Sequence, residues 1–269
     1  MRVAAGVEYC GTAFDGWQKQ PGRRTVQGCV EAAVASVADH PVEVHCAGRT
    51  DAGVHAVRQV IHFDTSSERQ PHSWVLGINS CLPRDINVLW AVPVQDDFHS
   101  RFSAISRSYN YLILNRPMRT GLYDRMLTWE RRRLDVVKMS EAAADLVGEH
   151  DFTSYRAISC QSKTPVRDVR KLIVIREGDL VVIDIEANAF LHHMVRNIAG
   201  VLIMIGMGKQ QPGWAKQVLD AKDRTLGGIT APPDGLYLVS VRYDGKFGIP
   251  GDDVGPGVVD LFNTLSGQE

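Results

Sequence analysis

The chain has 269 residues, 44% of them hydrophobic and 23% charged, and its formal net charge is −1. This is an ordinary globular composition, with enough length for one large domain or two small ones around a sizeable core. The sequence contains no run long and apolar enough to be a confident membrane span and no apolar signal-peptide region near its N-terminus. The near-neutral charge does not by itself indicate a nucleic-acid-binding protein.

The cysteines indicate neither a disulfide framework nor a metal site. Their number is odd and none forms a CxxC pair, which argues against a disulfide framework. The chain also lacks HExxH and paired Cys/His spacing, so we expect no metal site. A reducing, cytoplasmic location is the natural setting for such free thiols. The five cysteines are Cys10, Cys29, Cys46, Cys81 and Cys160.

One segment is strongly basic. Residues 99–133 contain eight arginines opposed by only Asp124 and Glu130, which gives a local net charge of +6. A neutral protein with such a segment can still present a basic face to a phosphate backbone. A solvated surface without a ligand is an equally good interpretation of charge alone.

The first half of the chain predicts the order β-α-β-β-α-β. Apolar residues in 25–38 recur at helical spacing, and Thr25 is a suitable N-cap. The expected strands are 2–9, 42–46, 57–63 and 86–94, and the expected helices are 25–38 and 71–82.

The second half predicts the same order again, with an additional helix near 213–222. The tetrapeptide REGD joins two apolar runs and is typical of a hairpin. The expected strands are 108–114, 169–175, 180–187 and 235–243, and the expected helices are 134–148 and 189–207.

These patterns predict an α+β (two-layer α/β) fold made of two similar split β-α-β-β-α-β halves. We expect the two sheets to flank a central cleft, with the helices on the outer faces. The domain boundaries are then 1–104 for the first half and 105–245 for the second. The remainder, 246–269, is rich in glycine and proline and should be irregular.

The link between the second and third strands carries the first candidate chemistry. It reads AGRTDAGVHA, with Asp51 between Gly48 and Gly53 and two residues after Arg49. Glycines allow a loop to turn tightly and to approach a ligand closely. A nearby arginine favours the ionised carboxylate, which can then act as a nucleophile or base at a sugar carbon. On spacing alone, a structural salt bridge is the commoner interpretation of such a pair.

A second polar cluster is predicted in the first turns of the helix 189–207. His192, His193, Arg196 and Asn197 lie together there, and the N-terminal turns of a helix favour phosphate. Core hydrogen bonding explains the same residues equally well. Tyr109 is predicted to alternate with polar residues on a strand, where it could stack on a base or simply pack.

The sequence resembles the tRNA pseudouridine synthase I (TruA) family from about residue 3 to about residue 244. The AGRTDAGVHA loop is similar to the family signature. The other similar segments, in family order, are FDGWQKQ (14–20), DDFHSRFSA (96–104), SYNYLI (108–113), DFTSYR (151–156), NAFLHHMVRNIAG (188–200), AKDRTL (221–226) and GLYLVSVRY (235–243).

The resemblance implies an isomerase that converts uridine to pseudouridine at positions 38, 39 and 40 of the tRNA anticodon arm, as a homodimer and without a metal or organic cofactor. It implies that Asp51 is catalytic and that Arg49, Tyr109 and Arg196 bind the substrate uridine. It further implies two tRNA-binding segments, one comprising Phe98, His99, Ser100, Arg101 and Phe102, the other Ser159, Cys160, Gln161, Ser162 and Lys163. The match is loose over 115–133, so no individual contact is assigned there.

The residues suit that chemistry. A base inside a stem must be flipped out before it can react, and Arg49 could fill the gap while Tyr109 stacks on the uracil. Whether Asp51 attacks the base, attacks the sugar or removes a sugar proton stays open. Two other classes remain possible from the residues alone. They are a non-catalytic RNA-binding module, which leaves Asp51 without a purpose, and an aspartate-dependent hydrolase, which lacks a second carboxylate or a metal set.

Overall fold

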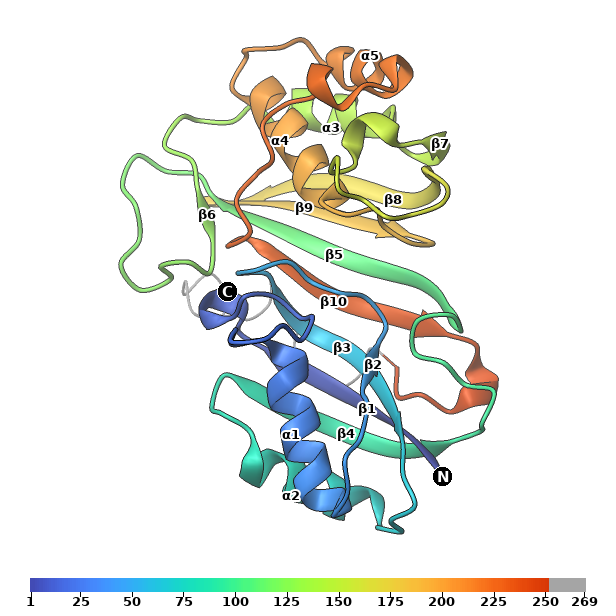
Figure 1. Cartoon of the computed structure of the whole chain (residues 1–269). Helices are drawn as coiled ribbons and strands as arrows, with labels where there is room; N and C mark the ends of the chain where they lie inside the picture. Colours follow the sequence, from blue (N-terminus) through green and yellow to red (C-terminus); the bar gives the residue numbers. More distant parts are fainter. Residues whose placement is uncertain (252–269) are drawn as a thin grey trace. The chain divides into compact units, whose positions relative to one another are not determined.

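The computed structural model describes residues 1–251, which form two compact units (Figure 1). The first unit contains Met1–Ile105 and the chain from Tyr237 onward, and the second is Ser106–Leu236. Of the predicted irregular tail, 252–269 lies outside the described residues, and Gly245–Phe247 forms a short 3-10 turn.

The sheet of the first unit has β1 at its centre. β1 is antiparallel to both β3 and β4, and the two-residue β2 is antiparallel to β3. β10 also joins β3, but in the parallel sense, at Tyr237 and Leu238. The strands are β1 (Arg2–Tyr9), β2 (His45–Cys46), β3 (His55–Asp64), β4 (Ile86–Val94) and β10 (Leu236–Tyr243).

Two helices, α1 (Val26–Ala38) and α2 (Pro71–Cys81), pack against this sheet, as Figure 1 shows. α1 begins where the sequence predicts, because Thr25 accepts a hydrogen bond from the Gly28 N–H through its side chain. The apolar face of α2 is buried, and the Trp74 ring meets Phe63 of β3 edge-on at 5.3 Å. Burial of these rings helps to hold this layer on the sheet.

A smaller core covers the other face of the same sheet. Phe98 is fully buried among Ala4, Val60 and the partly buried Trp90. Its ring lies 5.1 Å from that of Tyr243 and 5.2 Å from that of Phe247. The segment that follows β4 is therefore fixed to the sheet by an aromatic anchor.

The sheet of the second unit has the order β5-β9-β8-β7, in which every neighbouring pair is antiparallel. A short parallel strand, β6, adds to β5. The strands are β5 (Ala104–Leu114), β6 (Thr128–Trp129), β7 (Gly148–Asp151), β8 (Val166–Glu177) and β9 (Leu180–Ala187).

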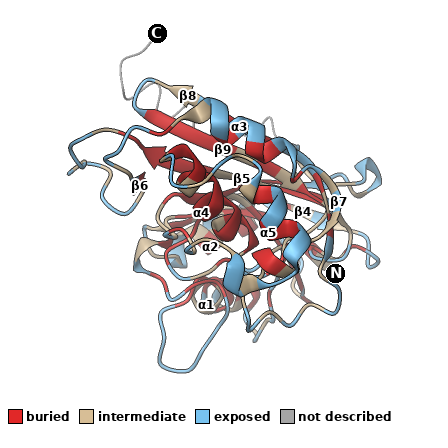
Figure 2. Ribbon diagram, turned by 90° about the horizontal axis from the view of Figure 1, so that it is seen from above, coloured by how far each residue is buried: buried red, intermediate tan, exposed pale blue. Residues whose placement is uncertain are grey.

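Three helices complete the second unit: α3 (Val136–Ala144), α4 (Met194–Gly206) and α5 (Trp214–Ala221). α4 is buried along nearly its whole length, whereas α3 and α5 each expose one side (Figure 2). Gly200 is needed in α4, because a Cβ there would lie 1.9 Å from the carbonyl oxygen of Ile229. No helix within residues 1–251 combines the length and the hydropathy of a membrane span.

Most of the predicted elements are present, with four differences. Only His45 and Cys46 of the predicted strand 42–46 are extended in a ladder. The helix predicted from 189 begins at Met194, after His193, whose φ is +62°. β6 and β7 were not predicted. The strand at 235–243, expected in the second half, pairs with β3 of the first unit.

Candidate active site

Asp51 lies in the loop that joins β2 to β3. Its side chain is partly exposed and that of Arg49 is exposed, so both are accessible on the loop. The Val54 N–H donates to the Asp51 carbonyl oxygen at 3.1 Å, which closes a tight turn. Gly53 has φ +80° in this turn, as the third residue of a type II turn requires. Gly48 is outside the left-handed region, so only one of the two predicted hinge glycines is required by backbone conformation.

Buried polar side chains hold the loop from below. The side-chain amide of Gln59, which is 0% exposed, donates to the Gly48 carbonyl oxygen at 2.6 Å and accepts from the Gly48 N–H at 3.3 Å. Thr50 and Tyr9 share a 2.8 Å hydrogen bond between their hydroxyl groups. Gly48 and Thr50, on either side of Arg49, are thus fixed by the buried side chains of Gln59 and Tyr9. Water cannot reach these side chains to replace the hydrogen bonds.

The segment 11–17 supports the loop from its other side. The Trp17 N–H donates to the Thr50 carbonyl oxygen at 3.0 Å, and the Gly53 N–H donates to that of Phe14 at 3.3 Å. A Cβ on Gly16, whose φ is +92°, would lie 2.9 Å from the Thr50 carbonyl oxygen. This close backbone approach explains structurally why glycine stands in the FDGW sequence.

A cysteine–histidine contact lies at the downstream end of the loop. His55 is 1% exposed, accepts the Gly11 N–H at Nδ1 and stacks on Tyr237 with ring centres 4.5 Å apart. A hydrogen bond with His55 lowers the pKa of the Cys10 thiol to about 7, against the opposing effect of burial. No spacing in the sequence predicts this pair, because Cys10 and His55 are 45 residues apart in the chain.

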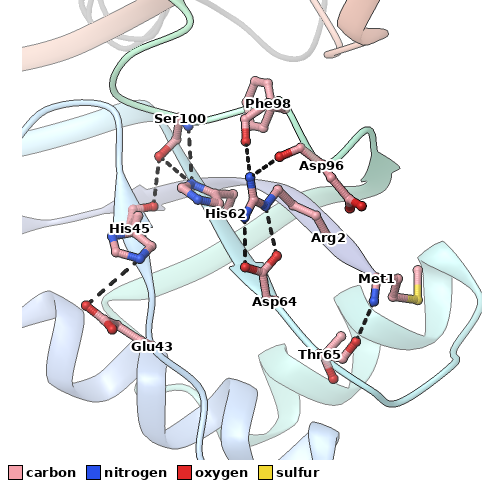
Figure 3. A network of polar contacts seen from close by, with 10 residues as sticks. All are labelled: Met1, Arg2, Glu43, His45, His62, Asp64, Thr65, Asp96, Phe98 and Ser100. Atoms are coloured by element: carbon pink, nitrogen blue, oxygen red, sulfur yellow. Dashed lines mark hydrogen bonds and ion pairs between the residues drawn. The ribbon is translucent and has the colours of Figure 1, made fainter.

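The first predicted tRNA-binding segment divides into buried and exposed members. Phe98 and Ser100 are both 0% exposed, whereas Arg101 and Phe102 are exposed. Figure 3 shows how the segment is held: Arg2 donates to the carbonyl oxygens of Asp96 and Phe98 and forms a two-bond ion pair with Asp64. The side chains of Phe98 and Ser100 therefore serve the fold, and any contact of this segment with RNA falls to its exposed members.

Tyr109 and Arg196 lie in the second unit. Tyr109, on β5, is 8% exposed and meets Phe190 edge-on at 5.1 Å. Arg196, on α4, donates from Nε to the carbonyl oxygen of Ala231 at 2.8 Å, and the Ala231 N–H donates to the Arg196 carbonyl oxygen at 3.1 Å. Tyr111 belongs to the core, because it is 0% exposed and its hydroxyl bonds to Thr128 and Pro232.

The predicted helical cluster at 192–197 separates into two parts. His192 precedes α4, so it is not a helical neighbour of Arg196, and its ring lies 3.4 Å from the Ser159 hydroxyl oxygen through Nδ1. Asn197 is buried and satisfies core groups, donating to the Tyr155 carbonyl oxygen at 2.7 Å and accepting from Arg224 at 3.0 Å. For Asn197 the core interpretation is confirmed.

The second predicted tRNA-binding segment, 159–163, is shaped by a residue that sequence reasoning missed. Arg167 is 8% exposed, and its guanidinium donates to the Thr164 carbonyl oxygen at 3.0 Å and to the Ser162 hydroxyl at 2.7 Å. It forms no ion pair with a carboxylate among residues 1–251, and its Nε has no hydrogen-bond acceptor there. Burial lowers the pKa of this guanidinium.

Comparison with known proteins identifies the family of this chain. A family model described as tRNA pseudouridine synthase matches residues 5–103 and 142–244. A protein of Nitrosococcus oceani named tRNA pseudouridine synthase A is 58% identical over 250 residues, covering 93% of this chain and 96% of its own. Proteins of the same name from Methylococcus capsulatus and Vibrio cholerae are 57% identical over 254 residues and 53% identical over 256 residues. These alignments cover 94% of this chain and 94% of the first relative, and 95% of this chain and 97% of the second. The chain belongs to the tRNA pseudouridine synthase family, whose members are isomerases that convert uridine to pseudouridine in tRNA.

Proposed function

We propose that this isomerase modifies uridines 38, 39 and 40 of the tRNA anticodon arm and that Asp51 is its catalyst. The observation that carries the proposal is the anchoring of the Asp51 loop. Buried hydrogen bonds from Gln59 and close backbone contacts from segment 11–17 hold a partly exposed carboxylate on a rigid turn. A reacting group fixed in this way loses little freedom when the substrate binds.

The proposed reaction rearranges one nucleotide. The bond between N1 of uracil and C1′ of ribose breaks, the uracil rotates, and C5 bonds to C1′. The proton on C5 leaves to solvent and N1 carries a hydrogen in the product, so atoms and electrons balance without an oxidant or a water molecule consumed. Asp51, as the ionised carboxylate, could add to the base, attack C1′ or remove a sugar proton.

The substrate uridine must leave the stem before it can react, which costs a few kcal/mol. We assign Arg49 to the space that the flipped nucleotide vacates, because its side chain is exposed on the same loop. Tyr109 is assigned to stacking on the extruded uracil and Arg196 to the neighbourhood of the reacting group. These two assignments rest on the family resemblance of their segments.

Docking of the tRNA is assigned to the exposed members of 98–102, to 159–163 and to the basic segment. Within the basic segment, Arg116, Arg125 and Arg132 pair with Asp179, Asp234 and Glu130. Arg119, Arg131 and Arg133 are exposed and form no ion pair among the described residues, which suits contact with phosphate. We also propose a cytoplasmic homodimer, and for each unit a variant of the split β-α-β-β-α-β fold, supported in the first unit by the order β4-β1-β3-β2.

The test is to map pseudouridine in tRNA incubated with the purified protein, with Asp51→Asn beside the parent. The parent should modify positions 38–40, and the variant should bind tRNA with parental affinity and form no product. Asp39→Asn is a matched control, since Asp39 is exposed at the end of α1 with φ +60°, a conformation that asparagine tolerates. Parental activity in the Asp51 variant would remove it as the catalyst.

The same experiment separates the other candidate classes. A binding module would retain tRNA and leave its nucleosides unchanged, and a hydrolase would release free uracil. Arg49→Ala should slow release of tritium from 5-labelled uridine more than it weakens tRNA binding, because flipping follows docking.

A further inference from the structure

Phe102 stands out among the aromatic residues of the described chain. Among the Phe, Trp and Tyr residues of 1–251, only Phe102 and Trp129 are exposed, and Phe102 is 75% exposed. The Trp129 indole is tied by its N–H to the Arg116 carbonyl oxygen at 2.9 Å, whereas no hydrogen bond constrains a phenyl ring. A single exposed apolar residue is ordinary by itself. What distinguishes Phe102 is the turn that carries it.

The turn 99–103 is closed by hydrogen bonds at both of its ends. The Ser103 N–H donates to the His99 carbonyl oxygen at 2.9 Å, and the Ser103 hydroxyl accepts the His99 N–H at 2.9 Å. The Nδ1 atom of His99 also accepts the N–H groups of Arg101 and Phe102, at 3.1 and 3.4 Å. The backbone beneath the phenyl ring is therefore fixed before any ligand arrives.

A ladder of planar rings continues behind Phe102. The Phe102 ring lies 4.4 Å from His99 between ring centres, His99 lies 4.5 Å from His62, and His62 stacks on His45 at 4.9 Å. Burial lowers the pKa of His62 to about 3 and also lowers that of His99, which favours the neutral form of these two rings. Ser100 locks it, because its N–H donates to His62 Nδ1 and its hydroxyl donates to the His45 carbonyl oxygen at 3.0 Å (Figure 3).

A cation lies beside the exposed ring. The Arg101 guanidinium lies 5.5 Å from the centre of the Phe102 ring. Two of the neighbouring carboxylates are paired with cations: Asp64 with Arg2 at 2.8 Å and Asp97 with Lys246 at 3.7 Å. An exposed ring beside an arginine, on a turn fixed by hydrogen bonds, has the composition of a nucleobase-stacking site.

We propose that Phe102 is a stacking platform for one unpaired base of the tRNA, with Arg101 on the adjacent phosphate and the three histidines as its rigid backing. This rests on the proposed function, because it names how the segment 98–102 would hold the tRNA. It goes further in giving one side chain a defined ligand group. The site contributes to docking and not to the chemistry at Asp51.

Two substitutions at position 102 test the platform. Phe102→Leu keeps an exposed apolar side chain but removes the π-face, and Phe102→Trp enlarges that face. We expect the leucine variant to raise KM and Kd for full-length tRNA about tenfold, as loss of one stacked base should, and the tryptophan variant to stay within about twofold of the parent. Fluorescence of the new indole should be quenched when tRNA binds, beyond the quenching of the parent's own tryptophans. Leu76→Ala, which alters an apolar residue on α2 that is 68% exposed, should leave KM and Kd unchanged.

Three results would overturn the proposal that Phe102 stacks on a base. Equal KM values for the leucine variant and the parent would overturn the platform, as would an unquenched indole. A change of oligomeric state in sedimentation velocity on Phe102→Leu would show instead that the ring is a subunit contact. Because Kd and quenching need no turnover, they remain readable even if the parent leaves positions 38–40 unmodified, which would refute the proposed function separately.

Discussion

Gln59 pairs with the backbone of Gly48 through its side-chain amide, donating to the carbonyl oxygen and accepting from the N–H. The pair reproduces with a side chain the two bonds that a neighbouring strand would supply. Gly48 lies three residues before Asp51, and the Gln59 side chain is buried. The loop is therefore held without an additional strand.

Gln59→Leu should therefore damage both stability and activity. The substitution leaves two backbone groups of Gly48 without partners, and one unsatisfied buried group costs about 1–3 kcal/mol. We expect the free energy of unfolding to fall by about 2 kcal/mol in denaturant titration and single-turnover pseudouridine formation to slow at least tenfold. Gln59→Glu retains the acceptor, but its buried carboxylate would face the Gly48 carbonyl oxygen without a proton to donate, so it should destabilise the protein at least as much as leucine does. Full activity in the leucine variant would mean that the loop is held by other contacts.

Gly16 and Gly22 form a matched pair for a second prediction. Both have positive φ, +92° and +68°, so alanine strains the backbone at each by about 1 kcal/mol. A Cβ on Gly16 would also meet the backbone of Thr50 and Ala52 at 2.9 and 3.1 Å, whereas nothing lies within 4 Å of one on Gly22. Gly16→Ala should lower kcat strongly, and Gly22→Ala should lower only the melting temperature. Equal kcat values for the two variants would show that the contact of segment 11–17 with the loop does not affect catalysis.

Replacement of Arg167 should weaken tRNA binding with little change in the free energy of unfolding. A buried cation without a carboxylate partner is costly, so Arg167→Met should change the free energy of unfolding by less than about 1 kcal/mol. The same change removes the bonds to Ser162 and Thr164 and should raise KM for tRNA several-fold through disorder of 159–163. Steady-state kinetics and urea titration on one preparation check both parts. A large loss of stability in Arg167→Met, together with an unchanged KM for tRNA, would contradict this prediction.

His62 should make stability depend on pH. Burial and the neighbouring histidines His99 and His45 lower its folded-state pKa to about 3 from the ordinary 6.5 of histidine, with Arg2 adding to this effect and Asp64 opposing it. Between these two values the unfolded chain binds the additional proton, so the stabilisation is complete above pH 6.5 and is lost as pH falls. We expect a loss of up to about 1.4 kcal/mol per pH unit from this residue below pH 6.

Urea midpoints of the parent and of His62→Gln at pH 7, 6 and 5 measure that dependence. Glutamine retains an acceptor for the Ser100 N–H and does not titrate, so its profile should be flatter. Parallel profiles for the two proteins would assign the acid sensitivity to other groups.

Sequence reasoning located Asp51 and its turn because glycine placement and an alternating pattern are local properties. It did not find Gln59, Gly16 or Arg167, whose roles depend on which distant backbone they meet. The predicted start of α4 is too early because Ala189, Phe190 and Leu191 extend the apolar period, while the left-handed His193 in the turn before α4 leaves no sequence signal. β6 and β7 are too short to show periodicity. Assignment of β10 to the first unit required its pairing with β3, which spacing along the chain cannot give.

The late position of β10 in the chain has a consequence for how the protein is made on the ribosome. The second unit, Ser106–Leu236, is one continuous stretch and can fold as soon as it emerges, whereas the first unit waits for a strand encoded after residue 235. Until Tyr237 arrives, His55 has no ring to stack on and the start of β3 has an open edge. A nascent chain stopped anywhere before that point carries the Asp51 loop without its last support, so catalytic competence should be the final property that synthesis confers.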